Sequence, residues 1–274
     1  MQICVQLALF LLFCLEFISS SMSFKPIDSH LHVWSDGKSP FDWAGPAVPE
    51  AMIKKGSAAF LIGKQLEAGV DGALIVQPIN HKFDHSFVLR VLAEYPQFKG
   101  MCLLDPECDD QYLIDLKEKG FVGVRFNPYL FPAGTSMSSE AGSKRFEQCG
   151  KLGLPVGFMC FKGLDKHIEE IQDLTSRYPE TTVVIDHWGF HIQDGSFQED
   201  SWNKLLSLSA NPKVHVKISA AFRNVVKKEW PYEELTARLG QLVQVSLSRS
   251  LGLMGQFLYT GGVLCHVHWF IRQL

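Results

Sequence analysis

Two histidines near the start of the chain have the spacing of metal or substrate ligands. His30 and His32 lie in the segment DSHLH, residues 28–32, at the end of a run that predicts a strand. Residues two apart on a strand point to the same face, so both imidazoles can reach one divalent metal ion. The alternative is a pair of structural histidines in a polar turn. Because the pair ends the first strand of a strand–helix repeat, we favour the ligand site.

A second candidate pair follows a later apolar run. Asp186 and His187 lie in the segment VVIDHWG, residues 183–189. We expect His187 to be a third metal ligand or to bind a substrate oxygen, and Asp186 to orient a neighbouring group. The alternative is that the two residues serve the start of the following helix.

Two arginines are candidate ligands of an anionic substrate. Arg125 lies in the apolar segment FVGVRFN, residues 121–127, where burial demands an anionic partner. A substrate carboxylate suits the planar guanidinium fork, and an internal salt bridge is the alternative. Arg223 follows a later apolar run and is either a second carboxylate ligand or an exposed surface residue. We expect His215 and Lys217, which share one face of the preceding run, to be polar groups of the barrel or scaffold.

Strand–helix alternation is the main signal of the fold. Seven apolar runs bounded by Gly, Pro or Asp predict strands at residues 26–34, 72–77, 98–104, 121–127, 155–161, 182–187 and 214–219. Amphipathic stretches predict helices at residues 49–68, 83–95, 109–119, 139–152, 164–178, 199–209 and 232–246. This order is typical of parallel strands joined by crossovers, and the number of units favours a barrel. In such a barrel, reactive residues lie at the carboxyl ends of strands.

The composition excludes several classes of function. The 274 residues carry 26 Lys and Arg against 29 Asp and Glu, a net charge of −3, and 46% are apolar. That balance is typical of a globular domain and excludes a disordered chain and a strongly basic nucleic-acid binder. No GxGxxG follows the first predicted strand, and no GxxxxGK[ST] or GxSxG occurs. Dinucleotide binding, a P-loop NTPase and an α/β-hydrolase are therefore disfavoured.

The N-terminal segment has two interpretations. Residues 3–17 are almost entirely apolar and are followed by three serines, which is typical of a signal peptide, although no Lys or Arg precedes Lys25. Alternatively, Met22 is the start and residues 1–21 are an upstream extension. The first interpretation predicts the secretory pathway and the second a cytoplasmic or organellar protein. The run is too short for a stable membrane span of about 20 residues.

Three motifs, taken in order, resemble those of a known enzyme family. The segments DSHLHVW (28–34), GVRFN (123–127) and DHWG (186–189) look like the amidohydrolase-related family, the amidohydrolase 2 branch of the metal-dependent amidohydrolases. The resemblance runs from about residue 25 to about residue 245. It is closest to plant members similar to 2-pyrone-4,6-dicarboxylate lactonase. It implies a TIM-like (β/α)8 barrel, in agreement with the strand–helix alternation.

The resemblance also implies a reaction and roles for residues. His30, His32 and His187 correspond to histidines that bind one divalent metal ion, zinc or manganese. In the dicarboxylate lactonase branch the histidines instead polarise the scissile carbonyl without a metal. Arg125 and Arg223 correspond to arginines that contact the substrate carboxylate. The expected function is hydrolysis of a small carboxylated lactone or a related C–O or C–N bond, and the alternative is decarboxylation of an aromatic acid, which the family also performs.

The chain departs from the family where an eighth strand is expected. The family has a Trp-Gly-Ser-Asp-like motif there, whose Asp activates water or binds metal. Residues 252–259 read GLMGQFLY instead, and no Asp or Glu follows Glu234. Loss of a general base typically costs about 10²–10⁴-fold in rate. We therefore expect an altered or missing eighth strand and an impaired or inactive chain. The alternative outside catalysis is a chain that binds a ligand without turnover.

The predicted organisation has three parts. An apolar extension at residues 1–21 precedes a barrel at residues 22–250, and a divergent apolar tail follows at residues 251–274. The predicted partner is a small carboxylated substrate.

Overall fold

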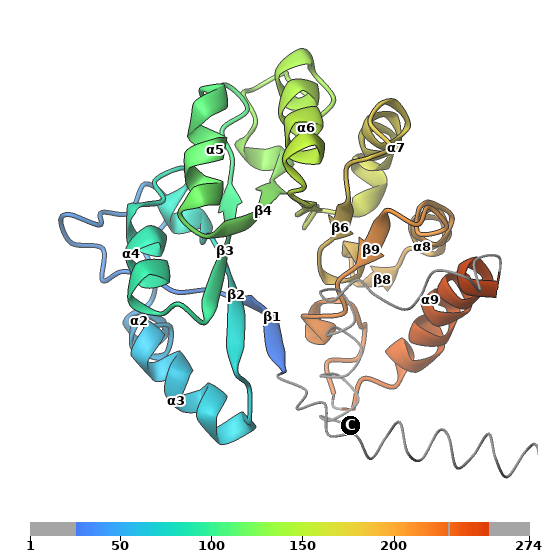
Figure 1. The fold of residues 1–274 in the computed structure, drawn as a ribbon. Helices are drawn as coiled ribbons and strands as arrows, with labels where there is room; N and C mark the ends of the chain where they lie inside the picture. The colour runs from blue at the N-terminus through green and yellow to red at the C-terminus, as the bar shows by residue number, and fades with distance from the viewer. Residues whose placement is uncertain (1–25, 230, 252–274) are drawn as a thin grey trace, which may run out of the picture.

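Seven parallel strands form the centre of the molecule in a computed structural model that describes residues 26–229 and 231–251. The strands pair in the order β1-β2-β3-β4-β5-β6-β9. Their bounds are β1 Ile27–Leu31, β2 Gly72–Val76, β3 Phe98–Leu103, β4 Phe121–Phe126, β5 Val156–Phe158, β6 Val183–Ile185 and β9 Val214–Val216. Figure 1 shows the sheet curling around a central axis with the helices outside it. The predicted strand–helix alternation is confirmed.

The helices cover the outer side of the sheet with one apolar face each. Leu113 and Leu116 of α5, three residues apart, are both fully buried, and Ile171 and Leu174 repeat the pattern in α7. None of the helices in the described ranges is long and apolar enough to cross a membrane. Their bounds are α2 Glu50–Lys55, α3 Ala58–Ala68, α4 Ser86–Glu94, α5 Asp110–Glu118, α6 Glu140–Leu152, α7 Ile168–Arg177, α8 Glu199–Leu208 and α9 Glu234–Leu251.

One predicted helix is split in two. The helix expected over residues 49–68 breaks where Gly56 ends α2 and Ser57 begins α3 by accepting a hydrogen bond from Phe60 N. Gly56 packs so closely against Trp34 that a Cβ atom at this position would lie 2.2 Å from the indole ring. The short hairpin of β7 (Ile192–Gln193) and β8 (Ser196–Phe197) was not predicted. Strands of two residues carry no alternation pattern to detect.

The sheet has two edges within the part of the chain that the structure describes. β1 and β9 each pair with one neighbouring strand, and no pairing joins them to each other. The described residues thus form a TIM-like barrel of seven strands with an opening between β1 and β9 (Figure 1). Residues 252–259, where the eighth strand was expected, lie outside the described residues. The same is true of the predicted extension at residues 1–21.

Alternate residues of a barrel strand face the hydrophobic core and the barrel axis. Val124 and Phe126 of β4 belong to the hydrophobic core, and the Phe126 ring contacts Phe146 of α6 at a centroid distance of 6.3 Å. Arg125 lies between them in sequence and therefore points to the opposite side of the strand, toward the axis. The fold thus places a buried guanidinium inside the barrel.

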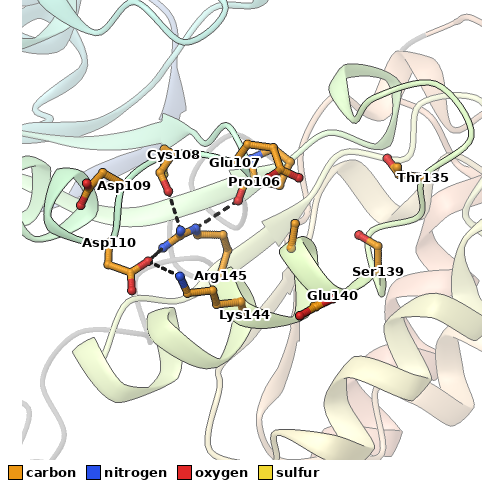
Figure 2. A pocket seen from close by; sticks show the side chains of 11 residues that line it. Pro106, Glu107, Cys108, Asp109, Asp110, Thr135, Ser139, Glu140, Lys144 and Arg145 are labelled. Atoms are coloured by element: carbon orange, nitrogen blue, oxygen red, sulfur yellow. Dashed lines mark hydrogen bonds and ion pairs between the residues drawn. The ribbon is translucent and has the colours of Figure 1, made fainter.

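A second buried arginine holds two of the outer helices together. Arg145 of α6 is 3% exposed and donates to the carbonyl oxygen of Pro106 over 3.1 Å and to Asp110 Oδ1 over 2.6 Å. A cavity of about 700 Å³ lies beside this arginine, and Figure 2 shows the side chains that line it. The exposed Lys144 contacts the same oxygen of Asp110 over 2.7 Å. None of the side chains that line this cavity belongs to the predicted site residues.

We expect replacement of Arg145 to destabilise the fold much more than replacement of Lys144. Arg145→Ala leaves buried carbonyl groups without donors, so the free energy of unfolding should fall by about 2–4 kcal/mol. Lys144→Ala removes an exposed ion pair to the same carboxylate and should cost less than about 1 kcal/mol. Urea unfolding of both variants measures the difference, and equal losses would contradict this account.

Candidate functional site

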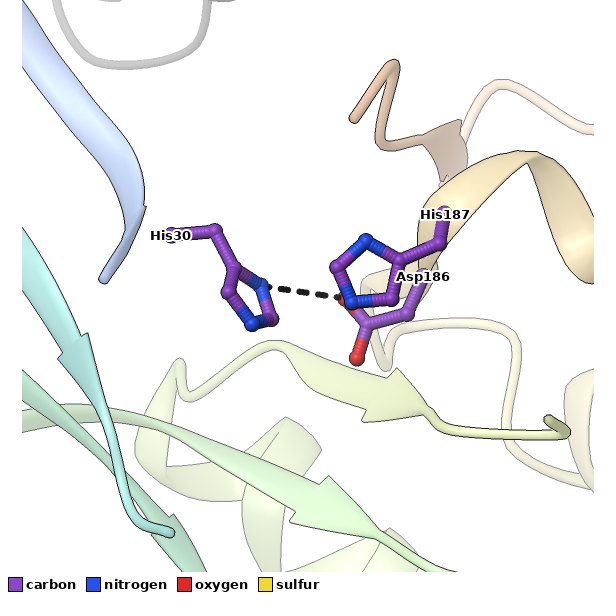
Figure 3. A group of neighbouring side chains, drawn as sticks. All are labelled: His30, Asp186 and His187. Atoms are coloured by element: carbon purple, nitrogen blue, oxygen red, sulfur yellow. Dashed lines mark ion pairs between the residues drawn. The ribbon is translucent and has the colours of Figure 1, made fainter. Parts of the chain in front are cut away.

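Six side chains from the ends of four strands meet inside the barrel. They form what we call the central cluster, and they are His30 and His32 from β1, Arg125 from β4, Asp186 and His187 after β6, and Lys217 after β9. Figure 3 shows His30 facing Asp186 and His187 across the barrel. The three predicted histidines and Arg125 are thus brought together.

Asp186 is the centre of this cluster. Its side chain is fully buried, and its Oδ2 atom accepts a hydrogen bond from Arg125 Nε over 2.7 Å. Its Oδ1 atom accepts no hydrogen bond of regular geometry but lies 3.0 Å from the Lys217 ammonium. Burial by itself would raise the pKa of Asp186, but Lys217 and Arg125 together hold that pKa well below its usual value. The group is therefore an ionised carboxylate between two cations.

Arg125 finds its anionic partner inside the protein. The internal salt bridge with Asp186 is the arrangement that the sequence analysis held as the alternative to substrate binding. One Nη2 donor also lies 2.9 Å from the Met159 sulfur. The residue is 5% exposed, so its guanidinium is buried with these partners inside the barrel.

Lys217, expected as a polar group of the barrel or scaffold, belongs to the central cluster. Its side chain is 2% exposed, and its Nζ atom lies 3.2 Å from His30 Nδ1. His215, on the strand before it, is half-buried. The sequence already contained a signal for this position. Lys217 lies near the end of the seventh predicted strand, just as the histidines lie near the ends of the first and the sixth. A lysine at that place in a barrel faces the same region as the other strand ends.

The histidines of β1 form a continuous chain of contacts. His30 Nε2 lies 3.3 Å from His32 Nε2, and His32 Nδ1 lies 2.8 Å from the carbonyl oxygen of Val76 on the neighbouring strand. Burial lowers the pKa of His32 to about 4 and that of His30 well below its usual value. Both imidazoles are therefore neutral at pH 7.

His187 is held in an unusual backbone conformation. It begins the 3-10 turn η4 (His187–Gly189) with φ 51°, and Trp188 and Phe190 also have positive φ values of 60° and 57°. A run of left-handed residues other than glycine stores strain, which is typical of functional sites. Asp186 makes no side-chain capping bond to this turn, so the capping alternative is not realised.

The ring of His187 faces both His30 and a serine. The His30 and His187 ring centroids are 4.4 Å apart, and His187 Nδ1 lies 2.7 Å from Ser219 Oγ. Burial lowers the pKa of His187 to about 4. The sequence analysis missed Ser219, although it lies two residues after Lys217 on the same segment.

Arg223 is the one predicted site residue that stays apart. It ends the 3-10 turn η5 (Ala221–Arg223), is exposed, and stacks over the neighbouring Phe222 ring at 5.6 Å. No recorded contact joins it to the central cluster among the described residues. It shares with Ser219 the loop that follows β9.

A metal-ligand arrangement can be recognised within the cluster. Ligand atoms of His30, Asp186 and His187 all lie within 4.8 Å of one another. His32 is not part of this group, in which Asp186 takes its place, so the group differs from the triad of histidines that the sequence analysis expected.

Comparison with known proteins assigns the chain to a family. The family model described as amidohydrolase matches residues 27–249, whereas no curated protein matches the chain. Three solved structures illustrate the fold that is shared. A probable 2-pyrone-4,6-dicarboxylic acid hydrolase from Acinetobacter baumannii with citric acid bound is 21% identical over 84% of this chain and 79% of that chain, with a TM-score of 0.62.

Two further structures extend the likeness. An amidohydrolase from Burkholderia multivorans with bound zinc is 14% identical over 84% of this chain and 93% of that chain, with a TM-score of 0.55. An uncharacterised TIM-barrel protein from Bordetella bronchiseptica is 14% identical over 73% of this chain and 77% of that chain, with a TM-score of 0.53. At such identities these structures confirm the TIM-barrel fold and nothing finer.

We expect Asp186→Ala to be strongly destabilising. The change leaves the Arg125 guanidinium and the Lys217 ammonium buried without their shared anion, which should lower the free energy of unfolding by about 3–5 kcal/mol. Asp110→Ala is the matched control, because that exposed carboxylate also pairs with an arginine and a lysine. Denaturant unfolding that shows a smaller loss for Asp186→Ala than for the control would contradict the central role of Asp186.

Mild acid should also destabilise the protein. Burial lowers the pKa of His32 and His187, and of His85 and His191 elsewhere in the fold, from 6.5 to about 4. The unfolded chain therefore binds more protons than the folded chain between these values, and stability falls as the pH drops from about 6.5 toward 4. Each histidine contributes up to about 1.4 kcal/mol per pH unit.

Urea unfolding at several pH values between 7 and 5 measures this slope. His85→Gln lies outside the central cluster and should make the slope shallower by one histidine. A free energy of unfolding that stays constant over this range would contradict the burial of neutral histidines.

Proposed function

The chain belongs to the amidohydrolase family, and from that premise we propose that its central cluster hydrolyses a small carboxylated lactone. The supporting observation is the meeting of His30, His32 and His187 with two buried cations at the carboxyl ends of the barrel strands. Amidohydrolase-type hydrolysis needs a polarised carbonyl, a positioned water molecule and charge to stabilise the oxyanion. This cluster offers donors, acceptors and positive charge in one place.

The reaction adds water across an ester bond. The water oxygen forms a bond to the lactone carbonyl carbon while the histidines polarise the carbonyl. The attacking water loses one proton, the tetrahedral oxyanion then collapses, the ring C–O bond breaks, and the leaving oxygen takes up that proton to give a hydroxy acid. Lys217 and Arg125 carry one more positive charge than Asp186 neutralises, so the cluster favours the developing negative charge.

The carboxylate of the substrate is assigned to the arginines. Arg125 is buried inside the barrel, where its charge acts on all three histidines, and a guanidinium fork matches a carboxylate. Arg223 is proposed as a second ligand, because its loop also carries Ser219, which contacts His187. The exposed position of Arg223 makes it suited to the outer end of a substrate.

A divalent metal ion does not fit the cluster as it is arranged. The atoms of His30 and Asp186 that face the centre already contact the Lys217 ammonium over 3.2 and 3.0 Å, and Arg125 occupies the second oxygen of Asp186. Two cations and one carboxylate already leave a net positive charge, and a dication would add repulsion in a buried site. We therefore derive the reaction from the side chains alone.

Removing Arg125 should affect the reaction more than removing Arg223. Arg223→Ala should raise KM for a dicarboxylated pyrone by about tenfold and leave kcat nearly unchanged, since it removes binding that is uniform along the reaction. Arg125→Lys keeps the charge next to Asp186 but loses the fork, so kcat/KM should fall by about 10²-fold. Steady-state kinetics on the dicarboxylate and on its dimethyl ester measure both effects.

Two other results would redirect the proposal. Release of carbon dioxide from aromatic acids, with no lactone hydrolysis, would establish the decarboxylase alternative. Binding of the dicarboxylate in calorimetry without any product would show a ligand-binding chain that does not turn over. Either result would overturn lactone hydrolysis as the function.

Metal content should depend on Lys217. Wild-type protein dialysed after purification in the presence of zinc should retain far less than one zinc ion per chain. Lys217→Met removes the competing ammonium and should retain more, since ligand atoms of His30, Asp186 and His187 lie within 4.8 Å of one another. Plasma mass spectrometry measures both, with Lys213→Met as the control on an exposed lysine of the same segment. One tightly held zinc ion per wild-type chain would contradict this prediction.

A further inference from the structure

The positions of the protons on His30 and His32 follow from the two ends of their contact chain. A carbonyl oxygen only accepts, so His32 Nδ1, 2.8 Å from Val76 O, must carry a proton and donate it. A lysine ammonium only donates, so His30 Nδ1, 3.2 Å from Lys217 Nζ, must carry a lone pair and accept. Each end of the contact chain thus fixes the protonation of one ring nitrogen.

The contact between the two rings fixes the remaining nitrogens. His30 without a proton on Nδ1 is a neutral imidazole and carries its proton on Nε2. His32 Nε2 lies 3.3 Å from that N–H, so it must offer a lone pair, since a second proton there would face the first. The chain of donors therefore runs in one direction, from Lys217 through His30 and His32 to Val76.

We propose that Lys217 is a positioning residue that gives the two neighbouring histidines opposite catalytic roles, His30 as hydrogen-bond donor and His32 as general base. This inference rests on the proposed lactone hydrolysis and deepens it. The contact of 3.3 Å between the two Nε2 atoms is longer than an ordinary N–H···N bond, so a substrate oxygen can replace it at little cost. When a substrate oxygen replaces this contact, the N–H donor of His30 and the lone pair of His32 become available side by side.

The assignment gives a balanced proton path. The lactone carbonyl oxygen accepts the hydrogen bond from His30 Nε2–H, and His32 Nε2 takes a proton from the attacking water. The new C–O bond pushes the carbonyl electron pair onto the oxygen, which keeps the hydrogen bond from His30 Nε2–H. When the carbonyl re-forms, the ring C–O bond breaks and its oxygen receives the proton from His32 Nε2. Both histidines then return to their starting protonation states.

The decisive measurement is a two-bond ¹H–¹⁵N correlation spectrum of the full chain at pH 7, which reports which nitrogen of each histidine carries the proton. His30→Gln and His32→Gln identify the two sets of signals. We expect His30 protonated on Nε2 and His32 protonated on Nδ1. A wild-type His30 protonated on Nδ1, or a His32 protonated on Nε2, would overturn the proposal without any variant of Lys217.

Variants separate positioning from general stability. Lys217→Met removes the donor to His30 Nδ1 and leaves Asp186 Oδ1, 3.9 Å from that nitrogen, as an acceptor that competes with His32 for the His30 proton. The His30 signals should therefore show a mixture of the two tautomers, while His32, still bound to Val76 O, keeps its proton on Nδ1. Lys213→Met changes an exposed lysine on the segment leading to the same strand and should leave both histidines unchanged. A His30 that remains fully protonated on Nε2 in Lys217→Met would exclude Lys217 as the positioning group.

Kinetics complete the test and separate it from the function itself. On a lactone that the wild-type chain hydrolyses, His32→Gln should lower kcat by about 10²–10⁴-fold, and Lys217→Met should lower kcat by about 10–10²-fold with little change in KM. A His32→Gln variant that retains full kcat would overturn the base assignment. If no lactone is hydrolysed, the proposed function fails, whereas the tautomers read from the spectrum still decide whether Lys217 orders the pair.

Discussion

The buried carboxylate of Asp186 is the constraint on which the site depends. A charge removed from water must be compensated, and here Arg125 and Lys217 compensate it from two other strands at 2.7 and 3.0 Å. The ion pairs therefore link the ends of β4, β6 and β9. Lys217 also reaches His30 on β1, across the opening where β1 and β9 do not pair among the described residues. Because the buried Asp186 charge must be compensated, loss of this carboxylate destabilises the fold. The same ion pairs bring the histidines together.

Charge and hydrogen-bond direction explain how identical side chains acquire different properties. His30 and His32 are both buried and neutral, yet one faces an obligate donor and the other an obligate acceptor. His187 differs again, since its strained backbone turns its ring toward His30 while Ser219 binds the other side. The cluster thus combines fixed positive charge with ordered neutral imidazoles, which is the kind of pre-arranged environment that stabilises an oxyanion.

Much of the fold could be predicted because its local signals agree. Asp109 and Ser139, residues of the types preferred at helix starts, cap α5 and α6, and Gly153 ends α6 in the left-handed conformation. The helix over residues 49–68 could not be predicted as two helices, because its break depends on Trp34 packing against Gly56, a contact between distant parts of the chain. The hairpin of β7 and β8 was missed because four residues show no periodicity.

The sequence by itself determined which chemistry was present at the strand ends. Apolar runs that finish in His30, His32, Arg125 and His187 set their place in a barrel, because strand periodicity and the position of a strand end are local properties. Only the tertiary structure decided their partners. It paired Arg125 and Lys217 with Asp186 and left Arg223 outside the cluster. Such choices depend on the distances between strands far apart in sequence and on compensating buried charge, and no local pattern encodes either.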